Sequence, residues 1–198
     1  RYAHRDYSLA PIAALIARQY AEKPGNYLAF FSSYTYLQAV LQELQIAHPR
    51  IPLWQQSRQM DESERQAFLD RFSSNGRGIG FAVLGGAFGE GIDLPGDRLI
   101  GAFIATLGLP QINPVNEEIK QRMELMFGSN NGYGYTYLYP GLQKVVQAAG
   151  RVIRTVQDQG VVYLIDDRFN QPAIRKLLPT WWKVERCRLP LHNEINAL

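Results

Sequence analysis

Two short apolar runs constrain the fold of this chain more than any other feature of its sequence. The runs Tyr27–Phe31 and Ile79–Leu84 contain no charged residue, which is typical of strands that are buried on both faces. Further strands are predicted at Ile51–Trp54, Leu99–Ala105 and Gly160–Ile165, with a last short one at Val184–Arg188. Helical patterns separate these strands, so the sequence predicts an α/β fold with a mainly parallel central sheet flanked by helices.

Segments with helical periodicity account for most of the chain between the strands. The expected helices run from an N-cap at Ser8 to Ala21, over residues 34–46, from a capping box at Asp61–Glu64 to Phe72, over Glu117–Phe127, over Leu142–Thr155 and over Ala173–Leu178. Residues 107–137 break the alternation and are expected to form an insertion, with a loop at Gly128–Gly134. In parallel sheets, ligand sites lie where strands end. We therefore expect the site in the loops that follow the strands.

Composition excludes several classes of protein. With 198 residues and 46% hydrophobic content, the chain can form one folded domain and is not disordered as a whole. No apolar run reaches the roughly 18 residues of a membrane span, so no membrane association is expected. One cysteine and three scattered histidines do not predict a metal site. The chain begins with Arg1 and shows no signal peptide, so we expect a piece of a longer, cytoplasmic protein.

Charge is distributed unevenly along the chain. The net charge is +3, yet residues 141–188 hold nine basic and four acidic residues. That segment is therefore +5 and the rest of the chain is −2. A basic segment in an otherwise near-neutral domain suggests an anionic partner such as phosphate or nucleic acid. A solvated surface is the alternative interpretation.

A glycine-rich stretch follows the predicted strand Ile79–Leu84. Four glycines in the seven residues Gly85–Gly91 let the backbone approach a ligand closely and expose its N–H groups. Glu90 and Asp93 add two carboxylates at its end. The stretch matches neither the phosphate-binding loop nor the dinucleotide fingerprint. It is either part of a binding site or an ordinary connection after a strand.

A second motif comprises Gln147-Ala-Ala-Gly150-Arg151-Val-Ile-Arg154. On one continuous helix, Gln147, Arg151 and Arg154 would share a face. Two guanidinium groups on one face suit phosphate oxygens. A solvated basic face would explain the arginines but not Gly150, which is unfavourable inside a helix by about 1 kcal/mol. Gly150 is expected to permit close approach of another surface.

Two further patterns allow alternative interpretations. The run Val161–Asp167 is similar to an apolar strand ending in a Mg²⁺-binding acid, but Asp166 and Asp167 could instead pair with Arg168 or its neighbours. Tyrosines alternate at positions 133, 135, 137 and 139. This alternation favours a β-like stretch with one buried tyrosine row over a surface that stacks nucleic-acid bases.

Taken together, the motifs resemble those of superfamily-two helicases. Residues 147–154 match the Gln-x-x-Gly-Arg-x-x-Arg motif, Gly85–Asp93 resembles the fifth motif and Tyr27–Tyr36 the fourth. Within that superfamily the chain is most similar to the DinG/XPD family, whose bacterial DinG-like members carry strings like Tyr139–Leu142 and Leu164–Arg168. The resemblance spans nearly the whole chain in the family's order.

This resemblance implies that residues 1–198 form a single, second RecA-like motor domain with a fold of the phosphate-loop NTPase type. The N-terminal motor half, absent from this chain, would hold the phosphate loop and Mg²⁺, and the parent could carry an iron–sulfur cluster. ATP would bind between the halves, and the enzyme would move 5′ to 3′ on single-stranded DNA. The implied roles are Arg151 and Arg154 as arginine fingers; Gln147, Gly150, Glu90, Gly91 and Asp93 at ATP; and Ser32, Ser33 and Tyr34 at DNA.

Two other functions remain open at this stage. The chain could be a non-catalytic RecA-like module that binds nucleic acid or a protein. It could also be a self-sufficient nucleotide enzyme that uses Asp166 and Asp167, although the missing phosphate loop counts against this. The helicase interpretation predicts that the chain alone has negligible ATPase activity.

Overall fold

The computed structural model describes residues 5–86, 88, 92–129, 131–152 and 160–187. Its five strands are β1 (Asn26–Phe31), β2 (Leu53–Gln55), β3 (Gly78–Val83), β4 (Gly101–Ala105) and β5 (Val161–Leu164). They form one sheet in the order β2-β3-β1-β4-β5, and all four pairings are parallel. The predicted parallel sheet is confirmed. The predicted strand at Val184–Arg188 is not found, because residues 184–187 have no regular secondary structure. Arg188 lies outside the described residues.

The central strand β1 explains why the apolar runs are continuous. All six of its residues are buried, and the five that follow Asn26 alternate between two cores. Leu28 and Phe30 belong to the core on one face of the sheet, whereas Tyr27, Ala29 and Phe31 belong to the core on the other. A strand covered on both sides needs apolar residues at every position.

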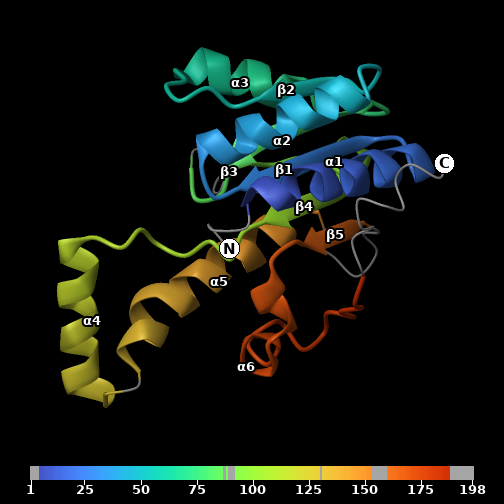
Figure 1. The fold of residues 1–198 in the computed structure, drawn as a ribbon. Coiled ribbons are helices and arrows are strands. Elements are labelled where there is room, and N and C mark those ends of the chain that lie inside the picture. Colours follow the sequence, from blue (N-terminus) through green and yellow to red (C-terminus); the bar gives the residue numbers. More distant parts are fainter. Residues whose placement is uncertain (1–4, 87, 89–91, 130, 153–159, 188–198) are drawn as a thin grey trace.

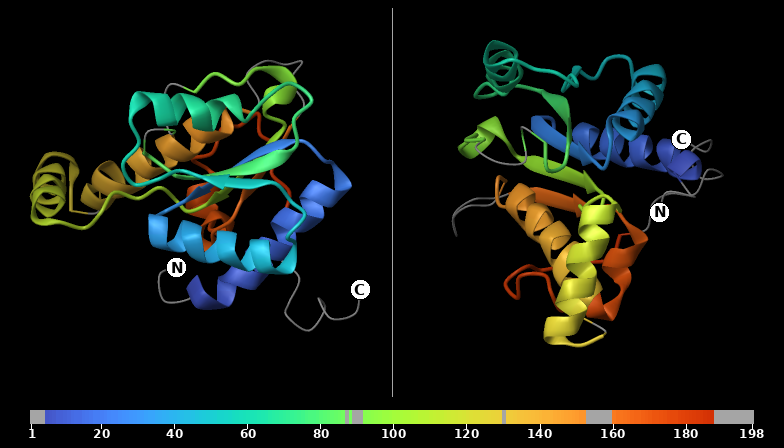
Figure 2. Two further views of the ribbon diagram at one scale, coloured as in Figure 1. Left: turned by 90° about the horizontal axis from the view of Figure 1, so that it is seen from above. Right: turned by 90° about the vertical axis from the view of Figure 1, so that its left-hand side faces the viewer.

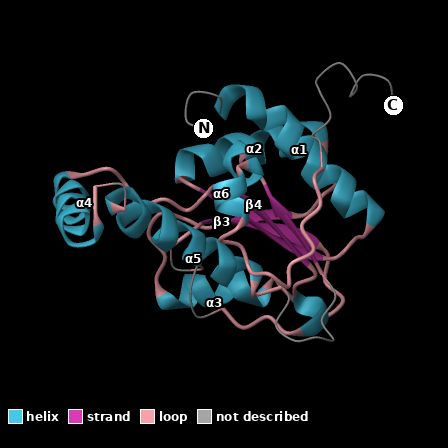
Figure 3. Ribbon diagram, turned by 90° about the horizontal axis from the view of Figure 1, so that it is seen from below, coloured by secondary structure: helices cyan, strands magenta, loops and turns pink. Residues whose placement is uncertain are grey.

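Helices cover both faces of the sheet (Figures 1 and 3). One layer consists of α1 (Arg5–Glu22) and α2 (Tyr34–Ala47). The other contains α3 (Glu62–Asp70), α5 (Tyr139–Ala149) and the short α6 (Pro172–Arg175). In the described part of the chain, no helix is both long and apolar enough to cross a membrane.

Helix starts were predicted with mixed success. The capping box of α3 is confirmed: Asp61 Oδ1 accepts from the Glu64 N–H at 2.8 Å, and Glu64 Oε2 accepts from the Asp61 N–H at 3.0 Å. The prediction that Ser8 caps α1 is wrong, because the helix begins at Arg5. The Ser8 hydroxyl lies instead 2.7 Å from the Tyr36 hydroxyl on α2.

Residues 107–137 contain the predicted helix, α4 (Pro114–Phe127), which projects from the body of the domain (Figure 2). It begins three residues earlier than predicted, because Asn113 caps it. The predicted loop at Gly128–Gly134 gives way to helix at Gly132. A π-helical segment, Gly134–Leu138, then leads directly into α5.

The alternating tyrosines therefore lie on a helix, and the predicted β-like stretch is wrong. Helical pitch brings every fourth residue together: the Tyr133 and Tyr137 rings are 5.5 Å apart, and those of Tyr135 and Tyr139 are 5.4 Å apart. Of the four, Tyr137 alone is buried. Its hydroxyl donates to Glu117 of α4 at 2.7 Å, and this hydrogen bond raises the pKa of Tyr137 to about 12. The bond ties the π-helical segment to α4.

Candidate functional site

The carboxyl ends of the parallel strands share one edge of the sheet, and two groups of predicted site residues, after β1 and after β3, follow these ends. Ser32, Ser33 and Tyr34 come directly after β1. Ser32 is exposed. The Ser33 hydroxyl accepts from the Tyr36 N–H at 3.3 Å and so caps α2. The Tyr34 hydroxyl donates to the Ser57 carbonyl oxygen, 3.2 Å away in the loop after β2.

The glycine-rich stretch leaves the same edge after β3. Gly85 has φ +80, and a Cβ there would lie 3.2 Å from Lys144 Cδ of α5. Phe88, Ile92 and Leu94 are buried in the core beneath α3 and α5, so they anchor the loop. Asp93 between them is exposed. Glu90 and Gly91, two of the predicted site residues, lie outside the described residues.

The second motif differs from the single helix that was predicted. Helix α5 ends at Ala149, Gly150 is its C-cap, and Arg151 and Val152 form a turn. The prediction that Gln147 and Arg151 share one helical face is therefore wrong, because Arg151 lies beyond the end of the helix. Arg154, the third residue of that predicted face, lies outside the described residues. Gly150 does not admit a neighbour in the described part of the chain, since a Cβ there would meet the carbonyl oxygens of Val146 and Gln147 alone. Because Gly150 follows the last helical residue, the mid-helix cost of a glycine does not apply to it.

Arg151 connects the two motifs. Its Nη1 donates to the Ile92 carbonyl oxygen at 2.7 Å, so the guanidinium group reaches the end of the glycine-rich stretch. Gln147, one turn earlier on α5, is exposed. The structure thus brings Arg151, Ile92 and the neighbouring Asp93 together, although these motifs are far apart in the sequence.

Two glycines allow α5, which carries the start of the second motif, to pack closely against the segment after β4. Gly108 follows β4 with φ +72, and a Cβ there would lie 2.7 Å from the Gly141 carbonyl oxygen. A Cβ on Gly141 would in turn lie 2.7 Å from the Leu107 carbonyl oxygen. Backbone meets backbone at this crossing, so neither position has room for a side chain. The crossing fixes where Arg151 emerges from α5.

Asp166 at the end of β5 is engaged by a basic neighbour. Arg168 Nε and Nη2 donate to the two Asp166 carboxylate oxygens at 2.8 and 2.7 Å, and the Arg168 backbone N–H donates at 3.0 Å. Burial by itself would raise the pKa of Asp166, but these hydrogen bonds and the Arg168 charge lower it. The pairing anticipated from the sequence is confirmed. Among the described residues, no group of three or more histidine, cysteine or acidic side chains could hold a metal ion.

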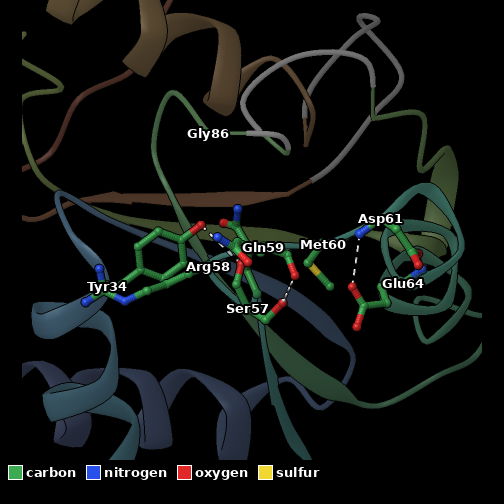
Figure 4. Close-up of a pocket in the computed structure, with 9 residues that line it drawn as sticks. Tyr34, Ser57, Arg58, Gln59, Met60, Asp61, Glu64 and Gly86 are labelled. Atoms are coloured by element: carbon green, nitrogen blue, oxygen red, sulfur yellow. Dashed lines mark hydrogen bonds between the residues drawn. The ribbon is translucent and has the colours of Figure 1, made fainter.

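Sequence reasoning missed the loop after β2. Residues 56–61, with Tyr34, Glu64 and Gly86, line an open pocket of about 660 Å³ on the carboxyl edge (Figure 4). The buried Gln56 accepts from the Val83 N–H at 3.0 Å through its side-chain oxygen, which fixes this loop against the start of the glycine-rich stretch. The run of polar residues directly after a predicted strand was the signal that could have found it.

Known proteins share this sequence and fold. A family model described as the helicase C-terminal domain matches residues 16–185. The ATP-dependent DNA helicase chl-1 of Caenorhabditis elegans is 30% identical over 89% of this chain and 22% of its own length. A probable ATP-dependent helicase of Methanocaldococcus jannaschii is 31% identical over 73% of this chain and 24% of its own length. The chain thus spans less than a quarter of these relatives.

A solved XPD helicase structure has the same fold. It superposes with a TM-score of 0.68 over 85% of this chain and 29% of its own, at 24% sequence identity. At that identity the likeness establishes the fold, which is the RecA-like arrangement expected from the sequence. The match to the family model covers most of the chain, and all the motifs quoted from the sequence lie within it. The chain therefore belongs to the helicase C-terminal domain family of XPD-, DinG- and CHL1-type superfamily-two helicases.

Proposed function

We propose that this chain is the second motor domain of a longer ATP-dependent DNA helicase that moves 5′ to 3′ on single-stranded DNA. ATP binds between this domain and an N-terminal motor domain, which holds the phosphate loop and Mg²⁺. The names of the relatives support the activity, and their length supports a second domain. Closure on ATP and opening after hydrolysis then move the DNA.

The observation that carries the proposal is the hydrogen bond between Arg151 and the Ile92 carbonyl oxygen. It brings an arginine-rich motif against the end of the glycine-rich stretch, although the two segments are far apart in the sequence. The sequence holds no phosphate loop of its own. Guanidinium groups without a phosphate loop suit a nucleotide that is held by another domain.

Each predicted site residue has a role in this proposal. Arg151 and Arg154 stabilise the charge that develops on the γ-phosphate. A guanidinium group has five N–H donors, so Arg151 can keep its bond to Ile92 and still contact phosphate. The loop would then sense the nucleotide through the same side chain. The residues that contact or sense ATP are Gln147, Gly150, Glu90, Gly91 and Asp93. The residues that lie along the DNA strand are Ser32, Ser33 and Tyr34.

An iron–sulfur cluster would have to be held outside this chain. Such clusters use four cysteine thiolates, and Cys187 is the single cysteine in the sequence. Cys187 is exposed and lies far from the carboxyl-edge loops in the sequence. Any cluster of the whole helicase therefore belongs to another part of it.

The deciding experiment is ATP hydrolysis by the full-length protein, with and without single-stranded DNA. Arg154→Ala should lower DNA-stimulated turnover by about a thousandfold or more while nucleotide binding is retained. Arg71→Ala is the matched control, because it removes the same charge from an exposed arginine that stacks on Trp54 beyond the end of α3. Duplexes with a 5′ or a 3′ single-stranded tail test the direction of movement.

Two results would contradict the proposal. Unchanged turnover in Arg154→Ala would remove this residue from the chemistry. Absence of turnover in both proteins, with DNA binding intact, would favour the alternative of a non-catalytic module that binds nucleic acid or a protein.

A further inference from the structure

The pocket after β2 includes an arginine that belongs to none of the motifs recognised in the sequence. The Arg58 guanidinium carbon lies 5.2 Å from the centre of the Tyr34 ring, and Figure 4 shows the two side chains together at one end of the pocket. Such cation–π stacking holds a guanidinium group flat on the ring and leaves its N–H edge accessible.

The Arg58 side chain is exposed. In the part of the chain that the structure describes, no carboxylate lies within ion-pair distance of it. Arg65, Arg122 and Arg168, by contrast, are each paired with an acid. A stacked arginine with no acidic partner is well suited to bind a phosphate group.

Hydrogen bonds fix the loop that carries Arg58. The Ser57 carbonyl oxygen accepts from the Tyr34 hydroxyl at 3.2 Å, and the Ser57 hydroxyl donates to the Gln59 carbonyl oxygen at 3.0 Å. The preceding residue, Gln56, is buried and bonded to β3. Arg58 is therefore held in place before a ligand arrives, which lowers the entropy lost on binding.

The acidic end of the pocket limits where a phosphate can lie. Asp61 and Glu64 bond each other's backbone N–H groups in the capping box. In Figure 4 they lie at the end of the pocket opposite Tyr34 and Arg58. Their negative charge disfavours phosphate at that end, so a nucleic-acid backbone would follow the side formed by Tyr34, Ser57 and Arg58.

We propose that Arg58 binds a backbone phosphate of single-stranded DNA and that Tyr34 is the positioning residue that holds it. This subsite rests on the proposed helicase function, and it extends the predicted DNA contact from the segment after β1 to the loop after β2. The two loops then form one wall for the strand, beside Gly86 at the start of the glycine-rich stretch.

The test is binding of labelled oligo(dT) of about 12 nucleotides to the 198-residue chain, which has its own core on both faces of the sheet. Fluorescence anisotropy should show at least about tenfold weaker binding for Arg58→Ala. The slope of the logarithm of the binding constant against the logarithm of the salt concentration should become shallower by about 0.7, the value for one phosphate contact on a single strand. Arg71→Ala, an exposed arginine stacked 4.7 Å from the Trp54 ring, is the matched control and should change neither quantity.

The positioning role is tested separately. Tyr34→Ala should weaken binding more when Arg58 is present than in Arg58→Ala, whereas a role independent of Arg58 would weaken binding to the same degree in both. Tyr34→Phe keeps the ring but loses the hydroxyl bond to Ser57, so it should weaken binding less than Tyr34→Ala does. Circular dichroism checks that each variant is folded.

The possible failures are distinguishable. Equal affinities for Arg58→Ala and Arg71→Ala would overturn this subsite and leave the helicase proposal intact. A wild-type chain that bound no oligo(dT) would overturn both the subsite and the proposed grip on DNA. If the full-length Arg154→Ala protein hydrolysed ATP at the wild-type rate, the proposed catalytic role of Arg154 would be wrong. The effect of Arg58→Ala on oligo(dT) binding would not depend on that result.

Discussion

At the scale of single residues, the partner of each arginine decides what that arginine can do. Arg168 is paired with Asp166 through two side-chain hydrogen bonds, so that carboxylate compensates its charge. Arg151 instead donates to a backbone carbonyl oxygen, which links the end of α5 to the segment after β3. The same residue type therefore pairs with a carboxylate beside β5 and with the backbone after α5.

The Asp166–Arg168 pair predicts a dependence of stability on pH. The folded chain lowers the pKa of Asp166, so the stabilisation is fully present above the unfolded value near 4 and is lost as pH falls through the folded value. Asp166→Asn should therefore reduce the free energy of unfolding by about 2 kcal/mol at pH 7 and by less at pH 3, below the unfolded pKa. Urea unfolding at both pH values measures this difference.

The control for that experiment is Glu185→Gln, which removes an exposed acid from the same part of the chain. It should change the unfolding free energy by less than about 0.5 kcal/mol at either pH. A loss in Asp166→Asn that stayed the same at pH 3 and pH 7 would contradict the prediction.

At the scale of helices and strands, the sequence predicted interiors better than ends. Strands β1 and β3 were found nearly to the residue, because a strand buried on both faces must be apolar throughout. The end of α5 was missed because Gly150 fits both a helix interior and a cap. The tyrosine helix was missed because residues spaced two apart imitate a strand, and that ambiguity is resolved only by packing against α4.

The candidate site was predictable to a similar extent. The motifs after β1 and β3 carry recognisable residue patterns, so their shared edge followed from the parallel sheet. The motif at the end of α5 lies instead toward the start of β5, because Val152 lies beside Gly160. The contact of Arg151 with Ile92 and the stacking of Arg58 on Tyr34 join segments distant in sequence. Such contacts depend on how the loops pack, and no local pattern reports them.

The glycine crossing beneath α5 yields a prediction at this scale. Gly108→Ala should destabilise the fold by more than about 2 kcal/mol, because left-handed backbone costs an L-residue roughly 1–2 kcal/mol and the new Cβ would lie 2.7 Å from the Gly141 carbonyl oxygen. Gly96→Ala is the matched control, since Gly96 has φ +62 and a Cβ there would meet nothing within 4 Å. Equal losses in urea unfolding would show that the backbone crossing does not constrain α5.

At the scale of the whole molecule, the domain has the arginine motif but not the phosphate loop, so its catalysis should depend on the rest of a longer protein. The 198-residue chain alone should release phosphate from ATP at a negligible rate even with single-stranded DNA, whereas the full-length protein should turn over about 1–10³ ATP per second. Phosphate release measured side by side decides this. If the chain alone hydrolysed ATP at a rate near that of the full-length protein, its own residues would have to bind and activate ATP. The proposal that it is the second motor domain of a helicase would then be wrong.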